Sequence, residues 1–326
     1  MNNLIRSTTV ALSIVLAGMV SAIPASAAEK KVAIANLGPH VALNAVVSGF
    51  KKGLEEGGFA EGDKVAFEYK DANFDPAVVA QMITALEATD PDLILTVTTP
   101  ITQASKRVVR NKDIPIVFAP VTDPVDAGLV TSWDKGSDRF VGASNLQSMQ
   151  TVLEFGKKLL GDVETVGLLY NPGDANDVVN VRYAEEAAEA MGIELNAVSV
   201  DTPNDIPVRI AALKGADFIY LIPSSMLQPA MPAVAAAANR AEIPVINASP
   251  AGVADGLVLA SMSVSWFDVG RQAGLRAAQI LDGAKPSDLS VFRPKSEDHS
   301  ALISAKRMDA MGMNLPDALS DCNCVK

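Results

Sequence analysis

The chain has 326 residues and a formal net charge of −11, and 49% of its residues are hydrophobic. So acidic a chain is a poor candidate for nucleic-acid binding, which selects for clustered Lys and Arg. The apolar content is enough for a full hydrophobic core, which excludes general disorder. At roughly 150 residues per domain, the length predicts about two domains.

Residues 1–27 differ from the rest and predict a cleavable signal peptide. Arg6 supplies positive charge, residues 10–20 form an apolar run, and Pro24 precedes the small residues 25–27. This order is typical of a secretory signal that is cut after its last small residue. The alternative is a membrane anchor, but the run is shorter than the about 20 apolar residues that span a bilayer. We therefore expect a soluble, periplasmic protein that begins at residue 28.

Short apolar runs alternate with segments of helical period through the remaining chain. Strands are predicted at residues 31–36, 65–69, 93–97, 114–118, 166–170, 195–200, 218–222 and 243–246. Helices are predicted near residues 42–57, 76–89, 100–110, 149–160, 177–191, 205–214, 230–241 and 267–281. Continuous β-branched runs suit strands that are covered on both faces. The pattern therefore predicts an α/β fold of parallel sheets flanked by helices.

The same order of elements runs twice, over residues 31–126 and again over residues 165–255. This repeat predicts two Rossmann-like lobes that are connected by a hinge, with a ligand cleft between them. We place lobe one at residues 28–145 and lobe two at residues 146–260. Residues 261–326 are then a crossover segment that returns to lobe one, followed by a C-terminal tail.

Polar side chains follow the predicted strands in both lobes, and ligands of open parallel sheets bind outside the carboxyl ends of the strands. The candidate ligand-binding residues are His40, Thr98, Thr99, Pro100 and Asp123 in lobe one, and Asn171, Asn176, Asp177, Ser224, Ser225 and Ser249 in lobe two. Several of them precede helices, whose free N–H groups favour a carboxylate. Thr99, Asp177 and Ser225 taken singly are better explained as helix N-caps. For the set as a whole, capping and ligand binding are even alternatives.

Motifs of catalysis are missing from the sequence: no G-x-S-x-G, Walker or G-x-G-x-x-G motif is present. Asp123 is open to interpretation as a catalytic acid, but an Asp before Pro124 is more often a turn residue. His40 either contacts a ligand or packs on the first helix. Trp266 and Phe267 either line the cleft or cover the base of the last helix. Nothing in the sequence demands an enzyme.

The two cysteines, Cys322 and Cys324, lie in the last five residues. A disulfide could form between them in an oxidising compartment, but so small a ring adds little stability. We expect a frayed tail with a thiol pair. His40 and His299 are too far away in sequence to complete a metal site with these thiols, so neither a metal nor a cofactor is expected.

The chain resembles the exported substrate-binding proteins of ABC transporters in the tryptophan/tyrosine-binding family. The resemblance rests on residues 40–50, 99–104, 121–130, 170–176, 243–245, 270–283, 301–306 and 311–316. It implies two lobes of the type I periplasmic-binding kind that close about a hinge on a ligand. It also implies that the loops at His40, Thr99, residues 171–177 and Ser224 line the cleft.

Two departures from the family pattern bear on the ligand. Asn176 is followed by Asp177 where the family has Asn-Ser, and Ser224-Ser225 stands where the family tends to carry an acidic residue. An acid there would suit a ligand's ammonium group. An aromatic or related amino acid is the ligand that the resemblance implies, and the departures leave the ligand class open.

Three functions remain after these observations. The first is a solute-binding protein that captures a small molecule and delivers it to an ABC permease with its ATPase. The second is an exported sensor that reports a ligand to a membrane receptor, and the third is an exported α/β enzyme. By analogy with proteins that close on a ligand, we expect a monomer.

Overall fold

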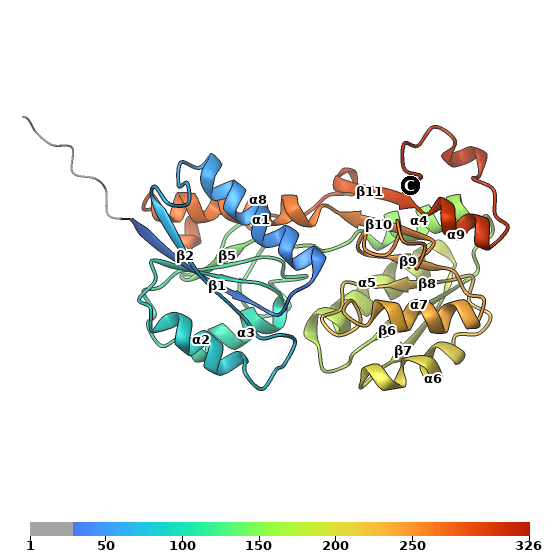
Figure 1. The fold of residues 1–326 in the computed structure, drawn as a ribbon, viewed down its shortest axis with the longest axis horizontal. Coiled ribbons are helices and arrows are strands. Elements are labelled where there is room, and N and C mark those ends of the chain that lie inside the picture. The colour runs from blue at the N-terminus through green and yellow to red at the C-terminus, as the bar shows by residue number, and fades with distance from the viewer. Residues whose placement is uncertain (1–28) are drawn as a thin grey trace, which may run out of the picture.

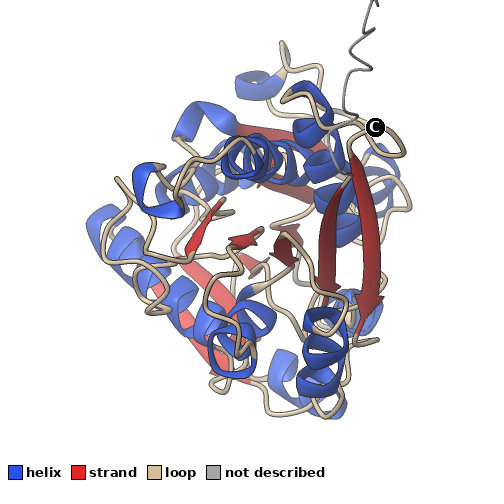
Figure 2. Ribbon diagram, turned by 90° about the vertical axis from the view of Figure 1, so that its left-hand side faces the viewer, coloured by secondary structure: helices blue, strands red, loops and turns tan. Residues whose placement is uncertain are grey.

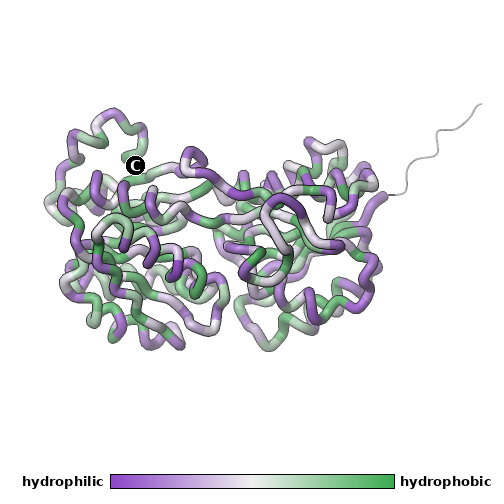
Figure 3. Tube along the Cα trace, turned by 180° about the vertical axis from the view of Figure 1, so that it is seen from behind, coloured by the Kyte–Doolittle hydropathy of each residue, from purple (hydrophilic) through white to green (hydrophobic). Residues whose placement is uncertain are grey.

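The computed structural model describes residues 29–326, so the predicted signal peptide lies outside the described residues. Two lobes are joined along one side (Figures 1 and 3). Each lobe has strands at its centre and helices on both faces (Figure 2). None of the helices in residues 29–326 combines the length and the apolar character that crossing a bilayer requires.

Lobe one is built on a parallel sheet with the strand order β2-β1-β3-β4-β5. Its strands β1 and β3 are almost completely buried, which explains their continuous apolar runs. The elements are β1 (Lys30–Asn36), α1 (Val41–Glu56), β2 (Val65–Asp71), α2 (Val79–Glu87), β3 (Leu93–Thr96), α3 (Thr99–Val108), β4 (Ile116–Phe118) and β5 (Phe140–Gly142).

Lobe two repeats this order in the sheet β7-β6-β8-β9-β10-β11. The repeated order confirms the two α/β lobes that the sequence predicts. The elements are α4 (Met149–Leu160), β6 (Thr165–Tyr170), α5 (Ala175–Met191), β7 (Glu194–Ser199), α6 (Ile206–Ala211), β8 (Phe218–Leu221), α7 (Met231–Arg240), β9 (Val245–Asn247), β10 (Ala260–Val264), β11 (His299–Ile303) and α9 (Ala305–Ala310).

One strand of lobe two departs from the expected parallel sheets, because β11 pairs with β10 in the antiparallel direction. The chain leaves β10 for lobe one, forms α8 (Trp266–Leu281) there and comes back to the same sheet edge. A strand that re-enters from the other lobe runs opposite to the strand that left. No apolar run marked β5, β10 or β11 in the sequence analysis.

The lobes are therefore connected by three segments within residues 29–326: one after β5, one after β10 and one between α8 and β11. The segment after β5 is bonded to the segment between α8 and β11. Phe292 N donates to Gly142 O at 3.0 Å, and Ser148 N donates to His299 Nε2 at 3.0 Å. A motion of the lobes must bend these segments together, which is the geometry of a hinge.

Helices α1 and α8 lie side by side over lobe one (Figure 1) and pack closely through glycines. A Cβ atom at Gly49 of α1 would overlap the carbonyl oxygen of Phe267, and one at Gly270 of α8 would overlap that of Val46. Each helix carries a second glycine four residues on, at Gly53 and at Gly274, on the same face. Only glycine allows the two backbones to approach so closely.

The C-terminal tail is docked on lobe two, and the expectation of a frayed tail is wrong. Ile303 N donates to Cys324 O at 2.8 Å, and Lys326 N donates to Ile303 O at 2.9 Å. Cys322 and Cys324 form a disulfide, and the Cys324 side chain is buried in the core of lobe two. These backbone bonds to β11, together with that burial, hold the tail in place.

We predict that Gly270→Ala lowers the free energy of unfolding by at least about 2 kcal/mol, because the added methyl overpacks a backbone contact. Alanine favours an isolated helix by about 1 kcal/mol over glycine, so propensity alone predicts the opposite sign. Gln279→Ala, at an exposed position of the same helix, is the control and should be nearly neutral. Urea denaturation measures both variants, and a Gly270→Ala protein as stable as the parent would contradict the packing argument.

Candidate functional site

A cavity lies between the lobes, and its walls come from both of them. Its walls come from the segments that follow β1, β2, β3, β4 and β5 in lobe one, and β6, β8 and β10 in lobe two. These are the carboxyl ends of the strands, where open α/β sheets bind ligands. The lining residues are Leu37, His40, Leu43, Phe74, Thr98, Thr99, Pro120, Thr122, Asn145, Asn176, Pro223, Ser224, Ser225, Gln228, Pro229 and Trp266.

The wall from lobe one is built around two helix N-termini. His40 is the N-cap of α1, and its Nδ1 accepts a hydrogen bond from Ala42 N at 3.3 Å. Burial lowers the pKa of His40, so the imidazole is neutral at pH 7 with its proton on Nε2. Thr98 caps α3 with a φ of 88°, a strained conformation for a β-branched residue. Such strain is typical of functional sites, and the Thr98 hydroxyl is buried without a partner among the described residues.

The wall from lobe two consists of amides and hydroxyls that the surrounding backbone holds in place. Asn176 Nδ2 donates to Asp177 Oδ1 at 2.8 Å, and Gln228 Nε2 donates to Asn247 Oδ1 at 2.7 Å. Ser224 Oγ accepts from Leu227 N at 3.1 Å and so caps the turn that leads to Gln228. Both amide nitrogens are thus engaged. The amide oxygens of Asn176 and Gln228 are buried without partners in residues 29–326.

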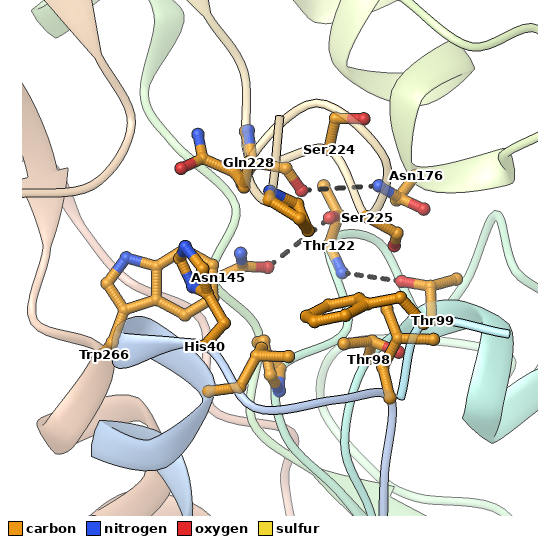
Figure 4. A pocket seen from close by; sticks show the side chains of 16 residues that line it. His40, Thr98, Thr99, Thr122, Asn145, Asn176, Ser224, Ser225, Gln228 and Trp266 are labelled. Carbon is orange, nitrogen blue, oxygen red and sulfur yellow. Dashed lines mark hydrogen bonds between the residues drawn. The ribbon is translucent and has the colours of Figure 1, made fainter. Parts of the chain in front are cut away.

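Apolar and flat side chains complete the cavity. In Figure 4, His40 and Trp266 lie on one side, and Asn176 lies on the opposite side with Ser225. Trp266, the first residue of α8, is 7% exposed and donates from Nε1 to Ala248 O at 3.4 Å. Phe74 follows β2 and packs against the core of lobe one. These side chains give the cavity its apolar surface.

Asp177 lies beneath this wall and is completely buried. Its Oδ2 accepts from Asn171 N at 2.8 Å, while its Oδ1 accepts from Asn176. Burial raises the pKa of Asp177 to about 7, and the nearby Asp174 carboxylate adds to the rise while the hydrogen bond from Asn171 N opposes it. Asp177 therefore orients Asn176 and does not itself line the cavity.

Two contacts cross between the lobes outside the cavity. Tyr183 OH on α5 donates to Asp123 Oδ2 at 2.8 Å, and Arg182 Nη1 pairs with Asp126 Oδ1 at 2.8 Å. Asp123 Oδ1 accepts from Val125 N at 3.0 Å, so the carboxylate also fixes its own turn. These contacts hold the lobes in a closed arrangement.

The candidate residues from the sequence divide into two groups. His40, Thr98, Thr99, Asn176, Ser224 and Ser225 line the cavity. The other five do not line it. Pro100 lies in the first turn of α3, Asp123 bridges the lobes, and Ser249 lines a neighbouring groove. Asp177 accepts hydrogen bonds from the backbone of Asn171 and from the side chain of Asn176, and so holds that loop in place. No group of three His, Cys, Asp or Glu side chains in residues 29–326 is placed to hold a metal ion.

The sequence analysis did not single out Leu37, Leu43, Phe74, Pro120, Thr122, Asn145, Pro223, Gln228 or Pro229 as binding residues, and it left Trp266 undecided. Most of them follow a strand, so their position was a usable signal. Phe74 follows β2, but its place also depends on a turn in which Asn73 and Phe74 have φ values of 48° and 61°.

Comparison with known proteins agrees with this architecture. A family model described as ABC transporter substrate binding protein matches residues 31–323. A tyrosine-binding protein of Clostridioides difficile (strain R20291) is 30% identical over 264 residues, which cover 81% of this chain and 76% of that protein. Two solute-binding structures that are only 16% identical, with TM-scores of 0.57 and 0.55, share the fold alone.

Two solved structures, one with a ligand and one that is ligand-free and open, superpose differently on this chain. The ABC domain from Streptococcus pneumonia in complex with L-Trp has a TM-score of 0.84 at 26% identity, and the match covers 91% of this chain and 100% of that one. The ligand-free, open structure of a substrate binding protein with adhesive properties from Clostridium difficile has a TM-score of 0.70 at 30% identity, with 91% and 99% covered. The more identical sequence gives the poorer superposition, so this chain is closer in overall structure to the ligand complex than to the open form.

We predict that Tyr183→Phe shifts the ligand-free protein toward an open form. Losing one hydrogen bond to a carboxylate costs about 1 kcal/mol, which changes the ratio of closed to open molecules about fivefold. Small-angle X-ray scattering should show a larger radius of gyration. Tyr69→Phe, which removes a phenol bonded within lobe one to Asn36, is the control. An equal radius for Tyr183→Phe and the parent would show that this contact does not hold the lobes together.

We also predict that ionisation of Asp177 destabilises the protein. The pKa of Asp177 in the folded protein, about 7, lies above its ordinary value of 3.8. The contribution of this group to the free energy of unfolding is therefore fully present below about pH 4 and is lost as the pH rises through 7. The melting temperature of the parent should therefore fall between pH 4 and 8, and that of Asp177→Asn should fall much less. Asp217→Asn, at a carboxylate that also accepts backbone N–H bonds but lies far from the cavity, is the control. Parallel curves for the parent and Asp177→Asn would contradict the assignment.

Proposed function

This chain belongs to the ABC transporter substrate-binding protein family, and from this premise we propose that it is an exported protein that captures a small molecule between its lobes and delivers it to an ABC permease with its ATPase. The family and the relatives of known role are solute-binding proteins, not enzymes, which removes the enzyme alternative. The observation that carries the proposal is the cavity at the carboxyl ends of the strands, with walls from both lobes.

The mechanism that we propose is reversible capture. A ligand first meets the residues of one lobe in the open form, and closure brings Asn176 and Gln228 of lobe two over the side chains of Thr98 and Trp266. Closure also forms the contact between Tyr183 and Asp123. The ligand stabilises the closed form by the contacts that it makes with both lobes at once. A permease then recognises a shape that only the closed form has.

An aromatic molecule, such as an aromatic amino acid or a relative of one, is the ligand class that we propose. Phe74 and Trp266 offer flat apolar surface, and His40 adds a neutral ring. The similarity to a tyrosine-binding protein and to a domain solved with L-Trp supports the same class.

We predict that an aromatic compound stabilises residues 28–326 in a thermal-shift screen that also includes nucleosides, sugars and carboxylates. A ligand at 100 times its dissociation constant adds about 2.7 kcal/mol of stability. The bound compound should be recovered unchanged, and scattering should show the closed form in its presence. A product that differs from the added compound would contradict a binding role, as would stabilisation without closure.

Delivery and export need tests of their own. The protein from a periplasmic fraction should begin at residue 28 by mass spectrometry. Uptake of the compound found by the screen should fail in a strain that lacks the gene and return when the gene is restored. Binding without any effect on uptake would favour the sensor alternative.

A further inference from the structure

The cavity carries no ionised side chain, and this constrains its ligand further than the fold does. None of the described residues that line it is Asp, Glu, Lys or Arg. His40 is the single titratable side chain in this lining, and burial lowers its pKa, so it contributes no charge at pH 7. An ammonium group on a ligand would therefore lose its hydration without meeting a carboxylate on these walls.

The carboxylates nearest to the cavity in the chain do not line it. Asp177 is completely buried, and each of its oxygens accepts a hydrogen bond, one from Asn171 N and one from Asn176 Nδ2. Asp123 accepts from Tyr183 OH with one oxygen and from backbone N–H groups with the other. Burial raises the pKa of Asp174, the N-cap of α5, and a hydrogen bond with Ser225 of the cavity lining opposes the rise, although Asp174 itself is not in the lining.

Three buried polar atoms of the lining lack partners among the described residues: the amide oxygens of Asn176 and Gln228, which accept hydrogen bonds, and the Thr98 hydroxyl, which can accept or donate. The amide nitrogen of Asn176 is held by Asp177, and the amide nitrogen of Gln228 is held by Asn247 and by Ile222 O at 3.0 Å. The two amides are thereby fixed in one orientation, and their oxygens remain buried with no partner in the described chain. An unpaired buried carbonyl oxygen is costly, so a ligand that supplies donors gains by satisfying it.

We propose that this cavity binds an aromatic molecule whose hydrogen-bond donors are uncharged N–H or O–H groups, in place of the ammonium group of a free amino acid. Asn176 and Gln228 are the residues that accept these donors, and Phe74 with Trp266 covers the ring. The inference rests on the proposed function, since it names the ligand of the same cleft. A carboxylate wall would select an ammonium, whereas these neutral oxygens select an amide, a phenol or a ring N–H.

Four compounds with one ring and different charge test this proposal by calorimetric titration of the parent protein. They are 3-(4-hydroxyphenyl)propanamide, which is neutral, tyramine, which is a cation, 3-(4-hydroxyphenyl)propionate, which is an anion, and L-tyrosine, which is a zwitterion. We expect the neutral amide to bind at least tenfold more tightly than tyramine and L-tyrosine. Equal or tighter binding of L-tyrosine or tyramine would overturn the proposal and leave the proposed function intact.

If none of the four compounds binds, this ligand class is wrong as well. The proposed function would then still stand if another compound of the wider screen closes the lobes, and it would fail if none does. The two failures are therefore distinguishable.

A matched pair of variants tests the charge argument independently. His40→Asp and His40→Asn both keep a side chain that caps α1, and Asp adds a carboxylate at the cavity wall. We expect His40→Asp to bind tyramine at least tenfold more tightly than His40→Asn does, with similar melting temperatures. Equal affinities of the two variants for tyramine would show that charge at this wall does not select the ligand.

Discussion

The close packing of α1 against α8 is the constraint on which the binding site depends. α1 belongs to lobe one, while α8 begins where the chain arrives from lobe two. Their glycine faces fix how the two helices lie, and both helices start at the cavity, with His40 capping one and Trp266 opening the other. The same backbone contact therefore anchors a hinge segment and sets two side chains of the ligand site.

The rest of the site follows from the doubled sheet. In both lobes the first five strands take the same order, so their carboxyl ends face the same space once the hinge brings the lobes together. Lobe one contributes a strained Thr98 and the neutral His40, and lobe two contributes amides that are oriented by their own neighbours. Each wall is held by hydrogen bonds within its own lobe.

Charge is kept at a distance from the ligand throughout this arrangement. The contacts that join the lobes, the ion pair of Arg182 with Asp126 and the hydrogen bond from Tyr183 to Asp123, lie outside the cavity. Asp177 acts on the cavity through Asn176, to which it is hydrogen-bonded. Its burial raises its pKa, so ionisation of this carboxyl destabilises the fold. Closure and ligand selection are thus served by different residues, which allows the ligand chemistry to change without loss of the hinge.

The sequence by itself determined the α/β class, the two lobes and the loops in which binding residues lie, because periodicity and strand order are properties of local segments. It also determined six of the lining residues, from His40 to Ser225, although it could not separate them from Asp123 or Ser249. Capping a helix and contacting a ligand use the same side chains, so only their positions in space distinguish the two roles. The tertiary structure alone decided that β11 returns to lobe two, that the tail docks beside it, and that Phe74 and Gln228 line the same cavity. These depend on contacts between residues far apart in the chain, which no local pattern records.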